Sequence, residues 1–225
     1  MRRFEHADHV LLADTTPDGR ARLDAVARWL QDAAYLDVAD AGSGEGGAWV
    51  VRRSRLEVSR FPRLGEAVEL TTWCSGLGKM WAERRTTIAG AVEATALWVH
   101  VDPDSGRPRP LDAGQLAVWG PSAGDRRVRA RLTHPDPPED AGARPWRFRA
   151  ADLDVAGHVN NAAYWAVVEE DLRLLEGPLV AEVEHRGAAL DGDAVVRRDV
   201  DRWWVCAPDG QIHASFVVGT RTVDT

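Results

Sequence analysis

The sequence has few of the features that mark secreted, membrane-spanning or nucleic-acid-binding proteins. Two cysteines among 225 residues are too few for a disulfide framework and favour a reducing, cytoplasmic location. No apolar run is long enough for a signal peptide or a membrane span. The net charge of −7 argues against non-specific nucleic-acid binding. Because no spaced set of cysteines and histidines is present, we expect neither a metal nor an organic cofactor.

The sequence contains an internal repeat. Residues 13–19 match residues 151–157 at a constant offset of 138, and residues 65–68 match residues 192–195 at an offset of 127. The matches occur in the same order, and the smaller second offset fits a shorter connection in the second half. We therefore interpret the chain as two related halves.

Each half is predicted to be one long helix followed by several strands. In the first half, apolar residues at helical spacing predict a helix beginning near Leu23, and strands are expected near residues 50–59, 68–72, 80–88 and 92–101. In the second half, we expect a helix from about Asn160 to Leu175 and strands near residues 180–184, 194–206 and 211–220. Sequential strands without alternating helices predict an α+β fold, with antiparallel sheets that join edge to edge.

This pattern divides the chain into three parts. Residues 1–120 form the first half, and residues 146–225 form the second. Residues 121–145 are rich in proline, glycine and arginine and are predicted to be a surface linker.

The segment Asp152–Glu170 carries the residues best suited to chemistry. Its first ten residues hold two carboxylates, a glycine, a histidine and two asparagines, directly before the second predicted helix. Hydrolysis of an acyl bond requires a base or nucleophile, an orienting group and an oxyanion site. The unpaired N–H groups at a helix start can supply the last of these.

Beyond this motif, the sequence resembles the acyl-acyl carrier protein thioesterases, a double hotdog family. In the first half the resemblance is carried by residues 29–34, 49–53, 72–73, 97–102 and 106–108. In the second half it is carried by Asp152-Leu153-Asp154, His158-Val159-Asn160-Asn161, Tyr164 and Gly192-Asp193. The resemblance implies a tandem hotdog, with two long helices each packed on an antiparallel sheet. It also implies hydrolysis of fatty acyl thioesters, with the active site in the second hotdog and acyl-chain selection mainly in the first.

The site residues follow from the motif and from this resemblance. Asp154 is the candidate acid–base or nucleophilic group and His158 its partner, because related single-hotdog thioesterases carry Asp-x-x-Gly-His before the helix. Gly157, Asn160 and Asn161 are the candidate oxyanion or orienting residues, although Asn160 is interpreted first as a helix N-cap. The alternative is structural: Asp154 caps a turn and His158 has no catalytic role.

Four further residues complete the candidate set. Glu170 is expected on the inward side of the second helix, where it orients the active-site loop or makes a structural hydrogen bond; we favour the structural role. Trp29, Met80 and Trp81 are the candidates for lining the acyl pocket.

The sequence also departs from the family pattern. Ala156 stands where the family usually has asparagine, and Ala188 stands where it usually has glutamate. An alanine can neither position water nor donate a proton. The nearby residues that could compensate are Glu184, His185, Asp191 and Asp193.

Three functions remain open: an acyl carrier protein thioesterase, an acyl-CoA thioesterase, and a catalytically weak acyl-binding protein. Lys79 is the only lysine, so docking of an acidic carrier relies on arginine, and residues 52–63 and 197–202 are the two arginine clusters. A solvated strand surface explains them equally well. The oligomeric state is predicted to be monomer or homodimer. Thr16 and Arg20 stand where the second half has Asp154 and His158, so chemistry is expected in one half only.

Overall fold

The computed structural model describes residues 1–42, 47–172 and 177–220. Three α-helices lie within these ranges: α1 (Leu23–Asp40), α2 (Ala113–Ala123) and α3 (Trp165–Leu172). The strands of the first half are β1 (Phe4–His9), β2 (Ala48–Val58), β3 (Ala67–Leu77), β4 (Trp81–Ile88) and β5 (Val92–Val101). Those of the second half are β6 (Gly142–Phe148), β7 (Leu179–His185), β8 (Gly192–Asp199), β9 (Arg202–Cys206) and β10 (Ile212–Thr220). No helix within the described ranges is both long and apolar enough to cross a membrane.

The strands form one antiparallel sheet whose order reflects the repeat. The order is β1-β3-β4-β5-β2-β7-β10-β9-β8-β6. Exchanging each strand for its counterpart in the other half gives the same order read from the opposite edge. The halves join where β2 pairs with β7, and at the centre of this pairing Arg55 lies opposite Glu182. These two residues are 127 apart, the offset of the later repeat, so a pseudo-twofold axis passes between them. The prediction of two related sheets joined edge to edge is confirmed.

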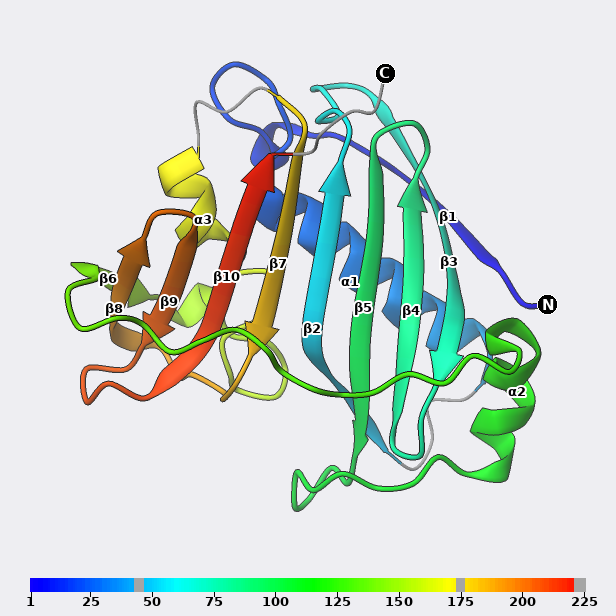
Figure 1. Ribbon diagram of the computed structural model, residues 1–225. Coiled ribbons are helices and arrows are strands. Elements are labelled where there is room, and N and C mark those ends of the chain that lie inside the picture. Colours follow the sequence, from blue (N-terminus) through cyan, green and yellow to red (C-terminus); the bar gives the residue numbers. More distant parts are fainter. Residues whose placement is uncertain (43–46, 173–176, 221–225) are drawn as a thin grey trace.

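Helices α1 and α3 lie behind the sheet, and the segment that follows α2 crosses its front (Figure 1). The main core lies between these helices and the sheet. It contains the apolar side of α1, including Leu23, Val26 and Trp29, and Phe216 from β10. Burial of this apolar surface is the main stabilising contribution to the fold.

The prediction of two long helices is only partly correct. Helix α1 spans 18 residues, but α3 begins at Trp165 rather than near Asn160, and residues 161–164 form turns. The predicted end at Leu175 lies outside the described residues. Glu170 is exposed, and the neighbouring Glu169 is buried instead. The prediction that Glu170 faces inward was wrong because residues 161–164 form turns instead of helix. Such turns change the helical phase, and one residue corresponds to about 100° of rotation.

Two further elements differ from the strand predictions. Residues 194–206 are not one strand but β8 and β9, which are joined by a tight turn in which Val200 has a φ of 49°. Helix α2 was not predicted; Asp112 caps it by accepting the Gln115 N–H at 2.8 Å. Trp119 of α2 packs in a second, smaller core with Leu77 of β3.

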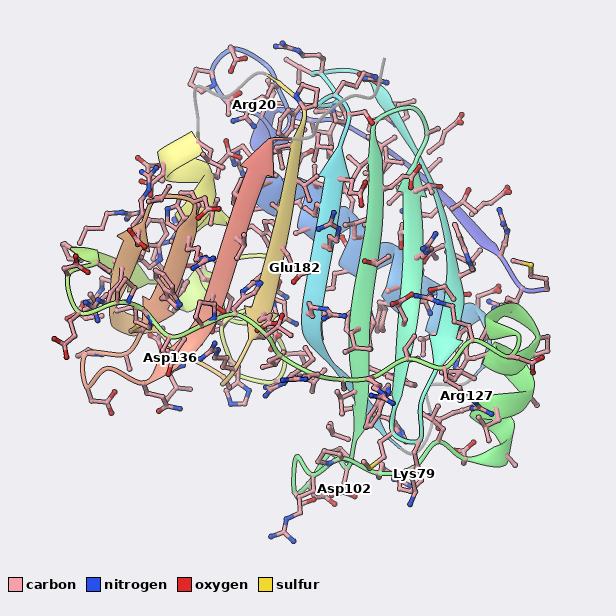
Figure 2. All side chains as sticks on the ribbon, in the orientation of Figure 1. Arg20, Lys79, Asp102, Arg127, Asp136 and Glu182 are labelled. Carbon is pink, nitrogen blue, oxygen red and sulfur yellow. The ribbon has the colours of Figure 1, made fainter. Side chains whose placement is uncertain are left out.

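Residues 124–141, here called the crossing segment, connect α2 to β6 and fasten onto the front of the sheet. The Nε1 of Trp81 donates to the carbonyl of Val128 at 2.8 Å, and the Nε1 of Trp204 donates to that of Pro135 at 2.8 Å. In Figure 2 the labelled Glu182 lies on this front side, near the crossing segment. The residues predicted as a linker therefore include the end of α2, the crossing segment and the start of β6.

Candidate active site

The motif turn projects from the end of β6 toward α3. The N–H of Asp154 donates to the carbonyl of His158 at 2.9 Å, and the N–H of Gly157 donates to the carbonyl of Asp154 at 2.9 Å. Gly157 has a φ of 74°, a conformation that glycine adopts without steric cost. The side chain of Asp154 accepts the Ala156 N–H at 2.9 Å, so it does cap the turn. Asp154 is half-buried and His158 is exposed.

The first half contains the same turn. The N–H of Thr16 donates to the carbonyl of Arg20 and that of Gly19 to Thr16, each at 2.9 Å, and Gly19 has a φ of 84°. These hydrogen bonds match those of Asp154, Gly157 and His158 one for one, at the predicted offset of 138. The repeat therefore extends to the backbone of the motif.

The side chains on the two turns behave differently. Arg20, the counterpart of His158, is only 2% exposed and forms a bidentate ion pair with Glu169, at 2.6 Å and 3.3 Å. Glu169 also accepts the N–H of Leu23 at 2.9 Å, at the start of α1. The Arg20 guanidinium lies 4.4 Å from the centre of the Phe61 ring. The site that corresponds to the motif in the first half is thus closed by a buried ion pair.

An open groove of about 710 Å³ lies beside the motif turn in the second half, between α1, β6 and the start of α3. This volume is in the range of small-molecule sites. Its lining includes charged residues: Asp24, Arg28 and Asp32 from α1, and Arg147, Arg149 and Asp152 around the motif. Burial alone would raise the pKa of Asp152, but hydrogen bonds from the Arg149 side chain and backbone N–H outweigh it and lower the pKa.

A narrow, mostly apolar slot of about 40 Å³ lies between α1 and the sheet. Its lining is drawn from four neighbouring strands, β4, β5, β2 and β7, and from the helix side. Its apolar walls are Ala27, Leu30, Val51, Leu56, Ala94, Ala96, Trp98 and Trp165. Gln31 and Ala162 line both the slot and the groove, so the two spaces meet beside the start of α3.

The structure brings some of the predicted site residues to this junction. Asn160 lines the groove and Asn161 lines the slot. The side chain of Asn160 accepts the Ala162 N–H at 2.8 Å, which is the capping role expected for it. Asp154 and His158 line neither space, but the turn that carries them is flanked by Leu153 and Asn160, which line the groove.

The predicted pocket residues lie elsewhere. Trp29 is 2% exposed in the main core, and Trp81 contacts the crossing segment through its indole N–H. Neither these residues nor Met80 is among those that line the slot or the groove. Gln31, which sequence reasoning missed, lines both. The repeat could have indicated it, because Gln31 is the counterpart of Glu169 at the offset of 138.

The structure also distinguishes the four residues proposed to compensate for Ala156 and Ala188. Asp191 is exposed, and exposed Asp193 pairs with Arg147 at 2.5 Å. The carboxylate of Glu184 accepts the backbone N–H groups of Thr133 and His134, at 2.6 Å and 3.0 Å, and so fastens the crossing segment. These three therefore have other positions or roles.

His185 is the member of this group that reaches the slot. It is 7% exposed, and its Nε2 has no hydrogen-bond partner among the described residues. Its ring packs edge-on against that of Tyr164, with centroids 5.3 Å apart. Burial, assisted by the charge of Arg52, lowers the pKa of His185 to about 4, so the imidazole is neutral at physiological pH.

One group of side chains has the composition of a metal site. The ligand atoms of His134, Glu182 and Glu184 lie within 4.8 Å of one another. His134 Nε2 lies 3.2 Å from Glu182, and this hydrogen bond lowers the pKa of Glu182. Because these atoms already bond to one another and to the crossing segment, we interpret the group as structural. Its hydrogen bonds attach the crossing segment to β7.

The chain shares its fold and its family with known thioesterases. The fold is that of the solved 12:0-ACP thioesterase from Umbellularia californica, with a TM-score of 0.77, 21% identity, and coverage of 97% of each chain. Residues 2–115 match the acyl-ACP thioesterase N-terminal domain, and residues 136–191 match the acyl-ACP thioesterase C-terminal domain. The chain belongs to the acyl-ACP thioesterase family and has its hotdog fold.

Two curated relatives show how far the similarity extends. The protein Rv2001 of Mycobacterium tuberculosis is 28% identical over 206 residues, covering 88% of this chain and 80% of that protein. The chloroplastic oleoyl-acyl carrier protein thioesterase 1 of Arabidopsis thaliana is 28% identical over 143 residues. That match covers 55% of this chain and 39% of the plant protein.

Proposed function

We propose that this chain is a thioester hydrolase that releases free fatty acid from acyl-acyl carrier protein (acyl-ACP), in the cytoplasm and in fatty acid biosynthesis. The observation that carries the proposal is the junction of two unlike spaces at Gln31 and Ala162. A fatty acyl thioester has the same division, because an apolar tail and a polar carrier arm meet at the carbonyl carbon. The slot suits the tail and the groove suits the arm.

The chemistry requires that water add to the thioester carbonyl and that the carbon–sulfur bond break. We assign the removal of the water proton to Asp154 and the delivery of a proton to the leaving thiolate to His158, which gives a fatty acid and a free thiol. Both side chains sit on the turn flanked by groove residues. The slot is narrow at about 40 Å³, so a long acyl chain enters only when the slot side chains move apart.

The carrier is the main alternative within this function. The surface arginines are already engaged: Arg60 pairs with Glu66 at 2.6 Å, and Arg197 donates to the carbonyls of Pro138 and Glu139 at 2.8 Å. The arginine clusters therefore do not distinguish an acidic carrier protein from the phosphates of coenzyme A. We favour the carrier protein because of the family.

The deciding experiment measures thiol release from matched acyl-ACP and acyl-CoA substrates, over a range of saturated chains, by the wild type and Asp154→Asn. We expect faster hydrolysis of acyl-ACP. We expect Asp154→Asn to lower kcat about 100-fold or more, because it removes the base while its side-chain oxygen still accepts the Ala156 N–H.

Asp18→Asn is the matched control, because Asp18 lies on the equivalent turn of the first half and is exposed. It should retain wild-type activity. Unchanged kcat in Asp154→Asn would show that Asp154 only caps its turn, and the hydrolase assignment would then need another base. No hydrolysis of either substrate by the wild type, with acyl binding retained, would instead support the acyl-binding protein.

A further inference from the structure

Gln31, Asn161 and His185 are slot-lining residues whose side chains have polar atoms without protein partners, as does the indole Nε1 of Trp98. Gln31 comes from α1, Asn161 precedes α3, and His185 ends β7, and all three line the slot. Neither the Gln31 nor the Asn161 side chain forms a hydrogen bond with another described residue. The Nε2 of His185 is buried and also has no partner there. Gln31 and Asn161 are half-buried, and His185 is buried. Because buried polar groups are normally hydrogen-bonded, the unpartnered His185 nitrogen in a slot that two amide side chains also line indicates a ligand.

The pseudo-twofold axis shows how this place differs from its counterpart. At the closed site, which contains Arg20, the Glu169 carboxylate accepts the N–H of Leu23 at 2.9 Å. The counterparts of these two residues, 138 positions away, are Gln31 and Asn161. Symmetry therefore directs Gln31 toward Asn161, and both line the same slot. The closed site has the Glu169 carboxylate, which is paired with Arg20. The open site has the neutral amide of Gln31 at the equivalent position, with N–H donors that bond to no described residue.

We propose that Gln31, Asn161 and His185 form the oxyanion site of this enzyme, where their N–H groups bind the carbonyl oxygen of the acyl thioester. This inference rests on the proposed function. It adds Gln31 and His185 to Asn161, which the sequence already predicted as an oxyanion or orienting residue. Gln31 belongs to the first half of the chain, so the reaction centre is built from both halves.

The chemistry of the three groups fits this role. Amide side chains donate N–H hydrogen bonds and carry no charge, so they stabilise a developing oxyanion without repelling it. A neutral imidazole donates in the same way, and burial keeps His185 neutral. As water adds to the carbonyl carbon, negative charge gathers on the oxygen that these donors hold. This negative charge is lost from the oxygen when the carbonyl group re-forms, the carbon–sulfur bond breaks and the thiolate leaves.

The test uses three single variants, Gln31→Met, Asn161→Leu and His185→Phe. Each should lower kcat for acyl-ACP hydrolysis about 100-fold, with KM little changed, because an oxyanion donor acts in the transition state. Thermal stability should be close to that of the wild type, because none of the variants removes a side-chain hydrogen bond between described residues.

Gln115→Met is the matched control. Gln115 is 4% exposed in α2 and lines neither the slot nor the groove, and its side chain bonds to His100 Nε2 at 3.1 Å. This variant should lower the Tm and leave kcat unchanged. If Gln31→Met and His185→Phe instead lower the Tm and keep kcat within a factor of about three of the wild type, the three residues are structural and the proposal is wrong.

A binding measurement tests the proposal separately from hydrolysis. The probes are a ketone isostere of the acyl thioester, in which CH₂ replaces sulfur, and the analogue without the carbonyl group. The wild type should bind the ketone more tightly, and Gln31→Met and His185→Phe should lose about 10-fold of that preference, which is the effect of one hydrogen bond. An equal preference in wild type and variants would contradict the oxyanion site even if the wild type hydrolyses acyl-ACP. Loss of the preference with no hydrolysis would support the carbonyl site but not the proposed function.

Discussion

Replacing Glu169 by glutamine is expected to lower the free energy of unfolding by about 3–5 kcal/mol. The change removes the negative charge opposite Arg20, whose side chain is 2% exposed. A buried guanidinium without a carboxylate partner has lost its hydration, and no ion pair offsets that cost. The same substitution weakens the hydrogen bond that Glu169 accepts from the N–H of Leu23. Urea unfolding followed by circular dichroism measures the difference.

Glu66→Gln is the matched control, because Glu66 forms a similar bidentate pair with Arg60 at the surface, at 2.6 Å and 3.0 Å. It should cost less than about 1 kcal/mol. The double variant Arg20→Met with Glu169→Leu should recover most of the lost stability, since an apolar pair avoids the buried charge altogether. A cost for Glu169→Gln as small as that of Glu66→Gln would show that water reaches Arg20 and that the first-half site is not closed.

Replacing Asp37 by asparagine is expected to have an effect of similar size, again about 3–5 kcal/mol. Asp37 is fully buried in α1 and pairs with Arg84 of β4 at 2.6 Å and with Arg2 at 2.8 Å. Both guanidinium groups also lie over the ring of Trp119 in α2, at 5.3 Å and 5.9 Å. The carboxylate thus connects four parts of the first half, and Arg84 has no other carboxylate partner among the described residues.

Asp40→Asn provides the control, since Asp40 pairs with the same Arg2 at 2.6 Å but is exposed. We expect a cost below about 1 kcal/mol for this variant. The two variants differ mainly in burial, so unfolding curves measured side by side test whether burial sets the energy of the pair. Equal costs would contradict the description of Asp37 as the buried centre of the network.

The internal repeat could be recognised from the sequence, and it predicted more than the individual motifs did. Its constant offset of 138 matched the two turns at Gly19 and Gly157, down to their hydrogen bonds. Its second offset of 127 also separates Arg55 from Glu182, which the structure places opposite each other where the halves join. Offsets survive because turn geometry and strand register depend on backbone conformation, which glycine positions and strand length largely determine.

The interior of the site could not be predicted in the same way. The turns at residues 161–164 shift the phase of α3, so helical counting placed Glu170 rather than Glu169 inside. Met80 and Trp81 are apolar residues predicted to line the acyl pocket, but the slot is lined by others, such as Ala94 and Trp98. Which side chains face a cavity depends on tertiary packing, and residue type alone does not determine it.

The edge strands show a related limit. Strand β1 alternates half-buried and exposed residues, yet its sequence from Phe4 to His9 contains few apolar residues. It is formed because its backbone pairs with β3, from Phe4 opposite Thr72 to His9 opposite Ala67. A strand that is stabilised mainly by backbone hydrogen bonds leaves little hydrophobic pattern to detect.

The central claim is that the chain has one open reaction centre, built by both halves, and one closed counterpart. Calorimetric titration with the ketone isostere of an acyl thioester tests this most directly, because it counts the sites that bind the reacting group. We predict one bound isostere per chain in the wild type and in the stable double variant Arg20→Met with Glu169→Leu. Two bound isosteres per wild-type chain would contradict the closed first-half site, and none would contradict the reaction centre itself.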